Sequence, residues 1–223
     1  MLYVKLAKIF LVCFSSIVLF SCSQSEDNSS DNSSDQQKYT SVVIGDQVWM
    51  KANLGVSKYQ NGDVIPQVQD AVKWANSTQG AWCYYENDTK NGKVYGKLYN
   101  WFAVNDPRGL APKGWHIPSV EEWTVLIDFL GGTEVAGGSI KSTALWNSPN
   151  AGAANSVFFN ALPGGWRENT GSFFDKGSLG LWWTVTEIAG ADAWFVYADS
   201  ATPEIVTGGD FKRVGFSVRC VKD

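Results

Sequence analysis

Alternating apolar and polar positions predict strands near both ends of the region from residue 39 to residue 223. Near its start, two short apolar runs flank Gly45-Asp46, a dipeptide that favours a tight turn, so residues 42–50 are predicted to form a β-hairpin. Near its end, aromatic-rich segments with a two-residue period predict three strands, at residues 181–186, 193–198 and 215–221.

The clearest helical pattern begins at Ser119. Ser119 and Glu122 form the sequence of a capping box, in which the serine oxygen and the carboxylate each accept a hydrogen bond from a free backbone N–H group. Apolar side chains then recur at helical spacing up to residue 130, and Gly131-Gly132 ends the pattern. Glu122 is therefore predicted to be a helix cap and not an acid catalyst.

Weaker signals fill the central part of the chain. Residues 69–76 are predicted to form a short helix, residues 81–85 a strand and residues 98–104 a helix. Asn61-Gly62 and Asn91-Gly92 have the composition of tight turns. Together these patterns predict an α+β fold with short strands, a few helices and long loops.

Residues 1–21 have the features of an export signal. Two lysines precede an uncharged run over residues 9–20, which is shorter than the ~20 apolar residues that span a bilayer. The run ends in Leu19-Phe20-Ser21-Cys22, which resembles the lipobox of bacterial lipoproteins, whose cysteine is lipidated and becomes the first residue after cleavage. We predict a lipoprotein signal peptide over 1–21 and a lipidated Cys22; a plain secretory peptide cut nearby is the alternative.

Residues 22–38 are predicted to be a disordered tether that follows the lipidated cysteine. From Ser23 to Gln37 the chain has no apolar side chain and repeats Asp-Asn-Ser-Ser, so burial cannot offset the entropy of ordering. The early acidic pair Glu26-Asp27 resembles the signal that carries some lipoproteins to the cell surface. The predicted location is the bacterial outer membrane, contacted through the lipid anchor, with the protein facing outward.

Composition and charge narrow the class of protein further. Hydrophobic residues make up 44% of the 223 residues and 11 residues are tryptophan, so the chain can bury a substantial core. The formal net charge is −4 and no basic patch is present, so nucleic acid is not an expected partner. His116, the single histidine, is predicted to be a hydrogen-bonded residue at the helix entrance, and we predict no metal and no cofactor.

The sequence was also examined for a calcium site, which needs about 6–8 oxygen ligands. Residues 87–92 resemble the start of an EF-hand loop, but Leu98 stands at the twelfth position, where the bidentate glutamate would be. A hairpin turn over residues 86–92 is expected instead. Four acidic residues fall in the late loops and would form another site only if they meet: Asp192, Asp199, Glu204 and Asp210.

Six short blocks rich in glycine and aromatic residues follow one another through the chain. They are Gly45–Leu54, Tyr95–Trp101, Gly114–Trp123, Leu162–Arg167, Trp182–Thr184 with Glu187, and Gly215–Cys220. In this order they resemble the Fibrobacter succinogenes major paralogous domain family. The resemblance implies a C-type-lectin-like fold, related to that of formylglycine-generating enzymes, as a single lectin-like domain over residues 39–223. It implies no activity, since fold alone does not set function.

Cys83 and Cys220 are the two cysteines of residues 39–223. In an exported protein a disulfide between them is predicted, and by chain entropy a closed loop of this length contributes about 4–5 kcal/mol. Two separate buried thiols are one alternative. A catalytic or copper-binding pair is another, which only the likeness to formylglycine-generating enzymes suggests. Ala111, where many family members have a cysteine, puts any disulfide pattern taken from the family in doubt.

The tryptophans give the one compositional hint of a ligand. An indole stacks on the apolar face of a sugar and adds a polar N–H, and an arginine can pair with a carboxylate or a sugar hydroxyl. The candidate ligand-binding residues are Trp166, Arg167, Trp182, Trp183, Trp194 and Tyr197. Neighbours in a strand face opposite ways, so Trp182 and Trp183 cannot both face the same side. Core packing of these residues is the alternative.

The sequence therefore predicts a lipid-anchored envelope protein whose domain binds a glycan or a protein without catalysis, and no catalytic residue is assigned. A structural component of an envelope complex, docking through an exposed apolar patch, is one alternative. An oxidase related to formylglycine-generating enzymes is the other, and it would need a free, reactive Cys83 or Cys220.

Overall fold

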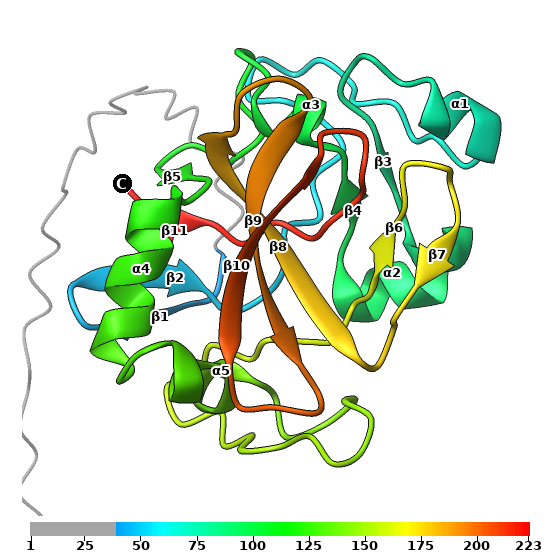
Figure 1. Ribbon diagram of the computed structural model, residues 1–223. Coiled ribbons are helices and arrows are strands. Elements are labelled where there is room, and N and C mark those ends of the chain that lie inside the picture. Colours follow the sequence, from blue (N-terminus) through cyan, green and yellow to red (C-terminus); the bar gives the residue numbers. More distant parts are fainter. Residues whose placement is uncertain (1–38) are drawn as a thin grey trace, which may run out of the picture. The chain divides into compact units, whose positions relative to one another are not determined.

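The longest strands form an antiparallel sheet at the centre of the computed structural model, which describes residues 39–223. This sheet has the order β10-β9-β8 and contains β8 (Leu179–Glu187), β9 (Asp192–Asp199) and β10 (Ile205–Phe211) (Figure 1). The described residues belong to one compact unit. The strand predicted at 181–186 lies within β8, and the one predicted at 193–198 lies within β9.

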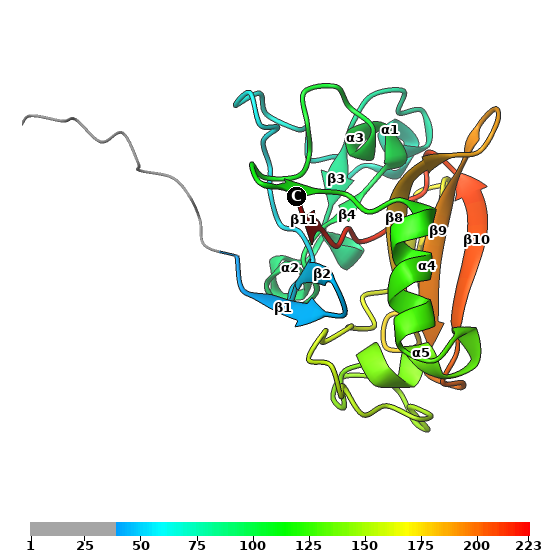
Figure 2. The ribbon, with the colours of Figure 1, turned by 90° about the vertical axis from the view of Figure 1, so that its left-hand side faces the viewer.

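One face of this sheet packs against two helices. Helix α4 (Val120–Phe129) contacts β8 and β9, and α5 (Thr133–Ile140) contacts β10. Figure 2 shows α4 running alongside the sheet. Trp123 of α4 meets Trp182 of β8 here, with ring centroids 6.0 Å apart. The predicted capping box at Ser119 is present at the start of α4, so the sequence located this helix correctly.

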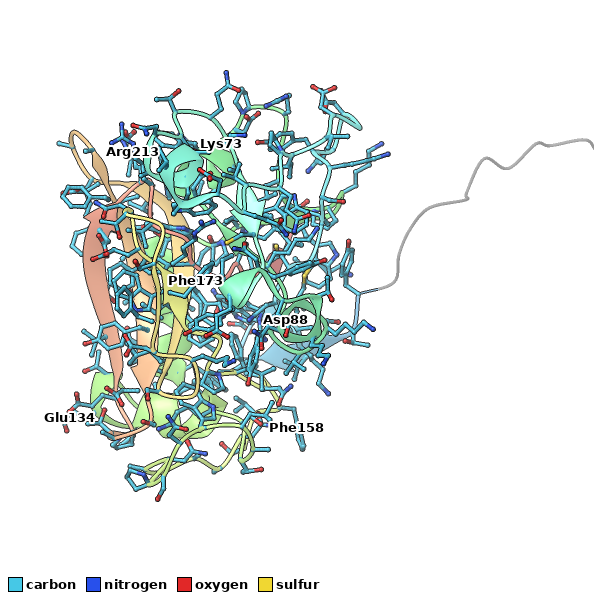
Figure 3. The ribbon with its side chains drawn as sticks, turned by 90° about the vertical axis from the view of Figure 1, so that its right-hand side faces the viewer. Lys73, Asp88, Glu134, Phe158, Phe173 and Arg213 are labelled. Carbon is cyan, nitrogen blue, oxygen red and sulfur yellow. The ribbon has the colours of Figure 1, made fainter. Side chains whose placement is uncertain are left out.

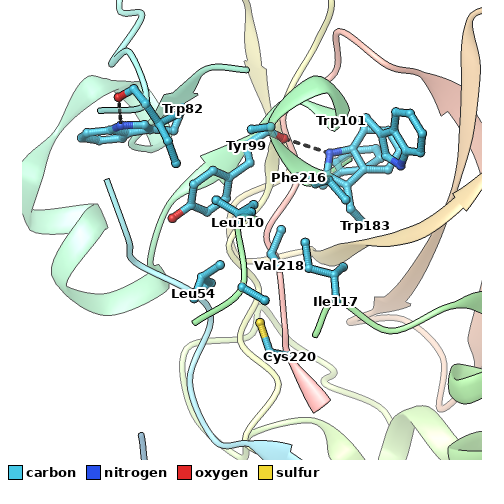
Figure 4. Close-up of a cluster of buried hydrophobic side chains, with 14 of the residues drawn as sticks. Leu54, Trp82, Tyr99, Trp101, Leu110, Ile117, Trp183, Phe216, Val218 and Cys220 are labelled. Carbon is cyan, nitrogen blue, oxygen red and sulfur yellow. Dashed lines mark hydrogen bonds between the residues drawn. The ribbon is translucent and has the colours of Figure 1, made fainter. Parts of the chain in front are cut away.

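The other face of the sheet packs against loops and short elements. Its core contains Trp183 and Phe216, whose rings lie 4.4 Å apart, and both residues are fully buried. Figure 4 shows this cluster, in which the Trp183 indole N–H donates to the Tyr99 carbonyl at 2.9 Å. Trp182 and Trp183 thus face opposite sides of the sheet, as the two-residue period of a strand requires.

A second sheet brings the two ends of the described chain together. Its order is β1-β2-β11-β5, with β1 (Ser41–Ile44), β2 (Gln47–Met50), β5 (Trp115–His116) and β11 (Val221–Lys222). The predicted hairpin is confirmed as β1 and β2, joined at Gly45, whose φ of 58° suits glycine.

Short elements complete the fold. The helices are α1 (Ala71–Ala75), α2 (Thr89–Tyr95) and α3 (Trp101–Val104), with a 3-10 turn at Tyr85–Asn87. The paired strands are β3 (Trp82–Cys83) with β4 (Leu98–Tyr99), and β6 (Trp166–Arg167) with β7 (Phe173–Phe174). The mixed α+β class with short antiparallel strands is therefore confirmed. Among residues 39–223, no helix is both long and apolar enough to cross a membrane.

Three predicted elements differ from the structure for identifiable reasons. The helix predicted at 98–104 begins only at Trp101, because Asn100 caps it and the two residues before pair as β4. Asn91-Gly92 lies inside α2, where a Cβ on Gly92 would come within 2.2 Å of the Tyr84 ring. The strand predicted at 215–221 makes isolated bridges to three different segments and becomes regular only at Val221.

The predicted disulfide is wrong. Cys83 and Cys220 are free thiols, and both are buried. Cys83 packs with Trp74 and Leu98, whereas Cys220 lies in the separate cluster that contains Val218. Burial raises the pKa of each thiol to about 12, which is typical of structural and not of reactive cysteines. The predictions for residues 1–38, including lipidation of Cys22 and the tether, lie outside the described residues.

Candidate functional site

A pocket of about 170 Å³ opens between the β6–β7 hairpin and the loop-covered face of the β8-β9-β10 sheet. Four of its lining residues are aromatic and two are acidic. The lining residues are Trp166, Asp175, Leu179, Leu181, Phe195, Tyr197, Asp210 and Phe216. Strand register explains part of this grouping, because Tyr197 pairs with Leu181 and neighbouring strand residues in register share a face.

Trp166 forms one wall of the pocket, and its indole is held in place on two sides. The indole N–H donates to a carboxylate oxygen of Asp175 at 2.8 Å, and the ring lies 5.5 Å from that of Phe174. Trp166 nevertheless stays partly exposed to solvent. An anchored and partly exposed indole presents a fixed apolar surface without losing much conformational entropy on binding.

Gly165 is required for this position of Trp166. Its φ of 64° lies in the left-handed region, and a Cβ there would approach the Phe174 carbonyl oxygen to 2.5 Å. The same Cβ would come within 2.7 Å of the Tyr85 ring. Glycine alone fits, so the backbone of this segment can pass close beneath the β6–β7 hairpin.

Three aromatic rings in contact with one another form the floor of the pocket. Phe216 is fully buried beneath Phe195, with a centroid distance of 4.7 Å, and Phe195 stacks on Tyr197 at 6.0 Å. A Cβ on Gly208 would come within 3.0 Å of the Phe195 ring, so this glycine leaves room for the ring across β10. Within residues 39–223, no protein group hydrogen-bonds to the Tyr197 hydroxyl, which is available to a ligand.

Asp210 closes the pocket from β10. Its carboxylate accepts a hydrogen bond from the Phe211 N–H at 2.7 Å. Burial raises the pKa of Asp210 above its ordinary value, and the charges of Asp192 and Glu168 raise it further, while the Phe211 N–H opposes this. The Phe211 N–H therefore offsets only part of the unfavourable effect that burial and the two acidic neighbours have on the charged form of Asp210.

The structure brings together two of the six predicted ligand residues. Trp166 and Tyr197 line the pocket. Trp182 and Trp183 are fully buried and serve the core, so their prediction as ligand residues is wrong. Trp194 belongs to the opposite face of the sheet, because it adjoins Phe195 in the strand.

Arg167 is also a structural residue. It is 1% exposed, and its guanidinium donates to the carbonyls of Val68, Gln69 and Gly171 at 2.6, 2.8 and 3.0 Å. These bonds tie the loop before α1 to the β6–β7 hairpin. The side chain is almost fully buried and does not line the pocket.

Phe195 and Asp175 were not predicted from the sequence, and Asp210 was considered only as one of four acidic residues that could form a metal site. Alternation along β9 could have found Phe195, since it stands two residues before Tyr197 and must share its face. Asp175 has a φ of 61° in a loop, and Asp210 lies in a strand interrupted by glycines. Neither carries a local signal of its position.

His116 and Glu122 form a hydrogen-bonded link at the start of α4. The two nitrogens of His116 contact Glu122 at 2.6 Å and Asp223 at 2.8 Å, and Glu122 also accepts from the Ser119 N–H. Burial alone would lower the pKa of His116, but bonds to the two carboxylates raise it overall. The helix cap predicted at Glu122 and the hydrogen-bonded position predicted for His116 at the helix entrance are confirmed.

Metal ligands do not gather in the described part of the chain. Within residues 39–223, no three His, Cys, Asp or Glu side chains come close enough to hold a metal ion. The four late acidic residues therefore do not form a shared site. The loop at 86–92 is not the expected hairpin turn either, because it enters α2.

The fold and the pocket define a small α+β domain with an aromatic recess built on the face of its central sheet. The chain belongs to the Fibrobacter succinogenes major domain family, whose profile matches residues 42–222. The resemblance inferred from the six blocks is thereby confirmed. No curated protein and no solved structure matches the chain. Two of the six blocks supply Trp166 and Phe216 to the pocket.

Proposed function

We propose that this domain is a non-catalytic recognition module that binds one ring of a glycan in the aromatic pocket. The observation that carries the proposal is the position of Trp166. Its indole is anchored by Asp175 at 2.8 Å and remains partly exposed at the pocket wall. Stacking of a sugar on such a ring removes apolar surface from water while the sugar hydroxyls stay solvated.

The size of the pocket favours a single ring. A cavity of about 150 Å³ is enough for benzene, whereas drug-sized ligands need about 300–1,000 Å³. The observed volume of about 170 Å³ therefore suits one six-membered ring. Tyr197 and Asp210 add a hydroxyl and a carboxylate, which are groups that hydrogen-bond to sugar hydroxyls.

The wider context of this module is also a proposal. We infer a C-type-lectin-like version of the α+β fold, on a lipid-anchored protein displayed at the bacterial outer membrane. The support comes from the signal-like residues 1–21, from Cys22, and from the polar residues 22–38. Labelling cells with radioactive palmitate tests the anchor: the intact chain should incorporate the label and Cys22→Ala should not.

Docking of an envelope protein is the second candidate function. Exposed apolar side chains occur along α4 and the neighbouring hairpin, where Val125 is 54% exposed, Phe129 60% and Val43 69%. Phe129 lies over the β1–β2 turn, within 3.0 Å of where a Cβ on Gly45 would be. The oxidase alternative has less support, because Cys83 and Cys220 are both buried.

Binding of glycans to the full chain in detergent tests the proposal. Intrinsic tryptophan fluorescence is followed while bacterial and plant oligosaccharides are added. Trp166→Ala should abolish the response, while Trp194→Ala should retain it. Trp194 is a matched control because it is also partly exposed, on the opposite face of the same sheet. Equal loss in both variants, or no response from any glycan, would refute the proposal.

A further inference from the structure

The pocket carries negative charge without any positive partner. Asp175 and Asp210 line it, and none of its lining residues is lysine, arginine or histidine. Within residues 39–223, neither carboxylate forms an ion pair. Each accepts a hydrogen bond from a neutral N–H group, that of Trp166 or of Phe211. These bonds orient the carboxylates but leave their charges in place.

The basic residues closest in sequence to the pocket are engaged elsewhere. The Lys176 ammonium lies 3.4 Å from Glu86 and 5.0 Å from the centroid of the Tyr85 ring. The Lys212 ammonium contacts Glu187 and donates to the Gly190 carbonyl at 2.7 Å. In both cases the protein supplies a carboxylate partner for the cation.

The remaining basic side chains nearby do not change this balance. The Arg167 guanidinium is buried against backbone carbonyls. Figure 3 shows Lys73 and Arg213 together at the upper edge of the molecule, above Phe173 of β7. The Arg213 Nε there donates to the Ser77 carbonyl at 3.3 Å. Asp192 and Glu168 add further negative charge near Asp210, so the acidic groups around the pocket act in the same direction.

The aromatic rings favour the same sign of ligand charge. Aromatic faces carry negative electron density, so cations bind over them, and several rings around one cation act together. Phe195 and Tyr197 form a stacked pair beside Asp210, and Trp166 faces the pocket from the opposite hairpin. An ammonium group would thus meet a carboxylate and ring faces in one recess of single-ring size.

We propose that the pocket selects a sugar ring that carries a protonated amine, so that its ligand class is amino sugars that are not N-acetylated. This inference rests on the proposed glycan binding and narrows it. The ammonium binds near Asp210 and the Phe195–Tyr197 pair, while the sugar ring stacks on Trp166. A neutral sugar of the same shape gains the stacking but leaves both carboxylates uncompensated.

Isothermal titration of the full chain in detergent tests this selectivity. Oligosaccharides of glucosamine, N-acetylglucosamine and glucose, of equal length, are compared at low salt and slightly acidic pH, where the free amine is protonated. The glucosamine oligomer should bind about 5- to 10-fold more tightly than either neutral oligomer. Added salt should reduce this ratio, since screening weakens charge interactions at partly exposed sites.

Two variants assign the preference to the pocket. Asp210→Asn should bring the ratio between charged and neutral oligomers close to one, because the charged oligomer loses its ionic partner. Asp128→Asn is the matched control, because Asp128 is an exposed aspartate on α4. This control should keep the full ratio.

The outcomes separate the two proposals. Equal affinity for all three oligomers in the unchanged protein, with binding lost in Trp166→Ala, would overturn the charge preference and leave glycan binding intact. A preference that survives Asp210→Asn, or that is lost equally in Asp128→Asn, would also overturn it. No binding of any oligomer would overturn both the selectivity and the proposed function.

Discussion

Replacing Arg167 with methionine is expected to destabilise the fold strongly without changing the chemistry of the pocket. The guanidinium is almost fully buried and its three hydrogen bonds reach backbone carbonyls at 2.6, 2.8 and 3.0 Å. It also lies 4.5 Å from the centroid of the Trp74 ring and 4.9 Å from that of Phe173. Methionine fills part of the volume but satisfies none of the carbonyls.

The size of the effect follows from these contacts. Hydrogen bonds to charged groups contribute about 1.5–3 kcal/mol each, and the sum is reduced where water reaches the freed carbonyls. We therefore expect Arg167→Met to lower the free energy of unfolding by about 4 kcal/mol. With a urea m-value of about 2 kcal/mol/M, the midpoint of unfolding should fall by about 2 M.

Urea unfolding of the full chain in detergent, followed by tryptophan fluorescence, measures this shift. Arg213→Met is the control, because Arg213 is exposed and makes one long hydrogen bond at 3.3 Å. It should change the free energy of unfolding by less than about 0.5 kcal/mol. If Arg167→Met costs under about 1 kcal/mol while glycan affinity is lost, Arg167 is a ligand residue and our structural assignment is wrong.

Three other perturbations test buried contacts and a titrating group. Gly165→Ala should destabilise the protein by about 2–4 kcal/mol in the same urea assay, because the positive φ of this residue and a clash with the backbone both oppose a Cβ. An unchanged urea midpoint would contradict the packing of the β6–β7 hairpin. Cys83 and Cys220 should resist alkylation by iodoacetamide in the folded protein and react in urea, which peptide mass spectrometry measures. Thiols that react in urea only after a reducing agent is added would indicate a disulfide. His116 should stabilise the fold by less than about 1 kcal/mol below its ordinary pKa of 6.5, and this contribution should be lost as the pH rises through the higher folded-state pKa. His116→Gln should flatten that pH dependence of the urea midpoint, and an unchanged profile would rule out this residue as its source.

Local patterns predicted those elements whose signals lie within a few residues. The hairpin at 42–50 was predictable because Gly45 permits its turn. Helix α4 was predictable because Ser119 and Glu122 satisfy its first N–H groups and the apolar residues share one face. In both cases the information is contained in contacts between near neighbours.

Elements that depend on distant partners were missed. Strand β10 contains Gly208 and Gly209, which disfavour strands locally, yet it pairs with β9 along its whole length. Gly92 resembled a turn residue but lies in a helix that packs against the Tyr84 ring. Here tertiary packing overrides the intrinsic preference of the residue.

The sequence by itself determined the family, the α+β class and the enrichment in tryptophan from which a ligand site was suspected. Only the tertiary structure decided which aromatic residues are exposed. Trp166 forms a pocket wall, whereas Trp182 lies in the core. The physical reason is that burial depends on which segments pack over each residue, and these segments lie far apart in the chain.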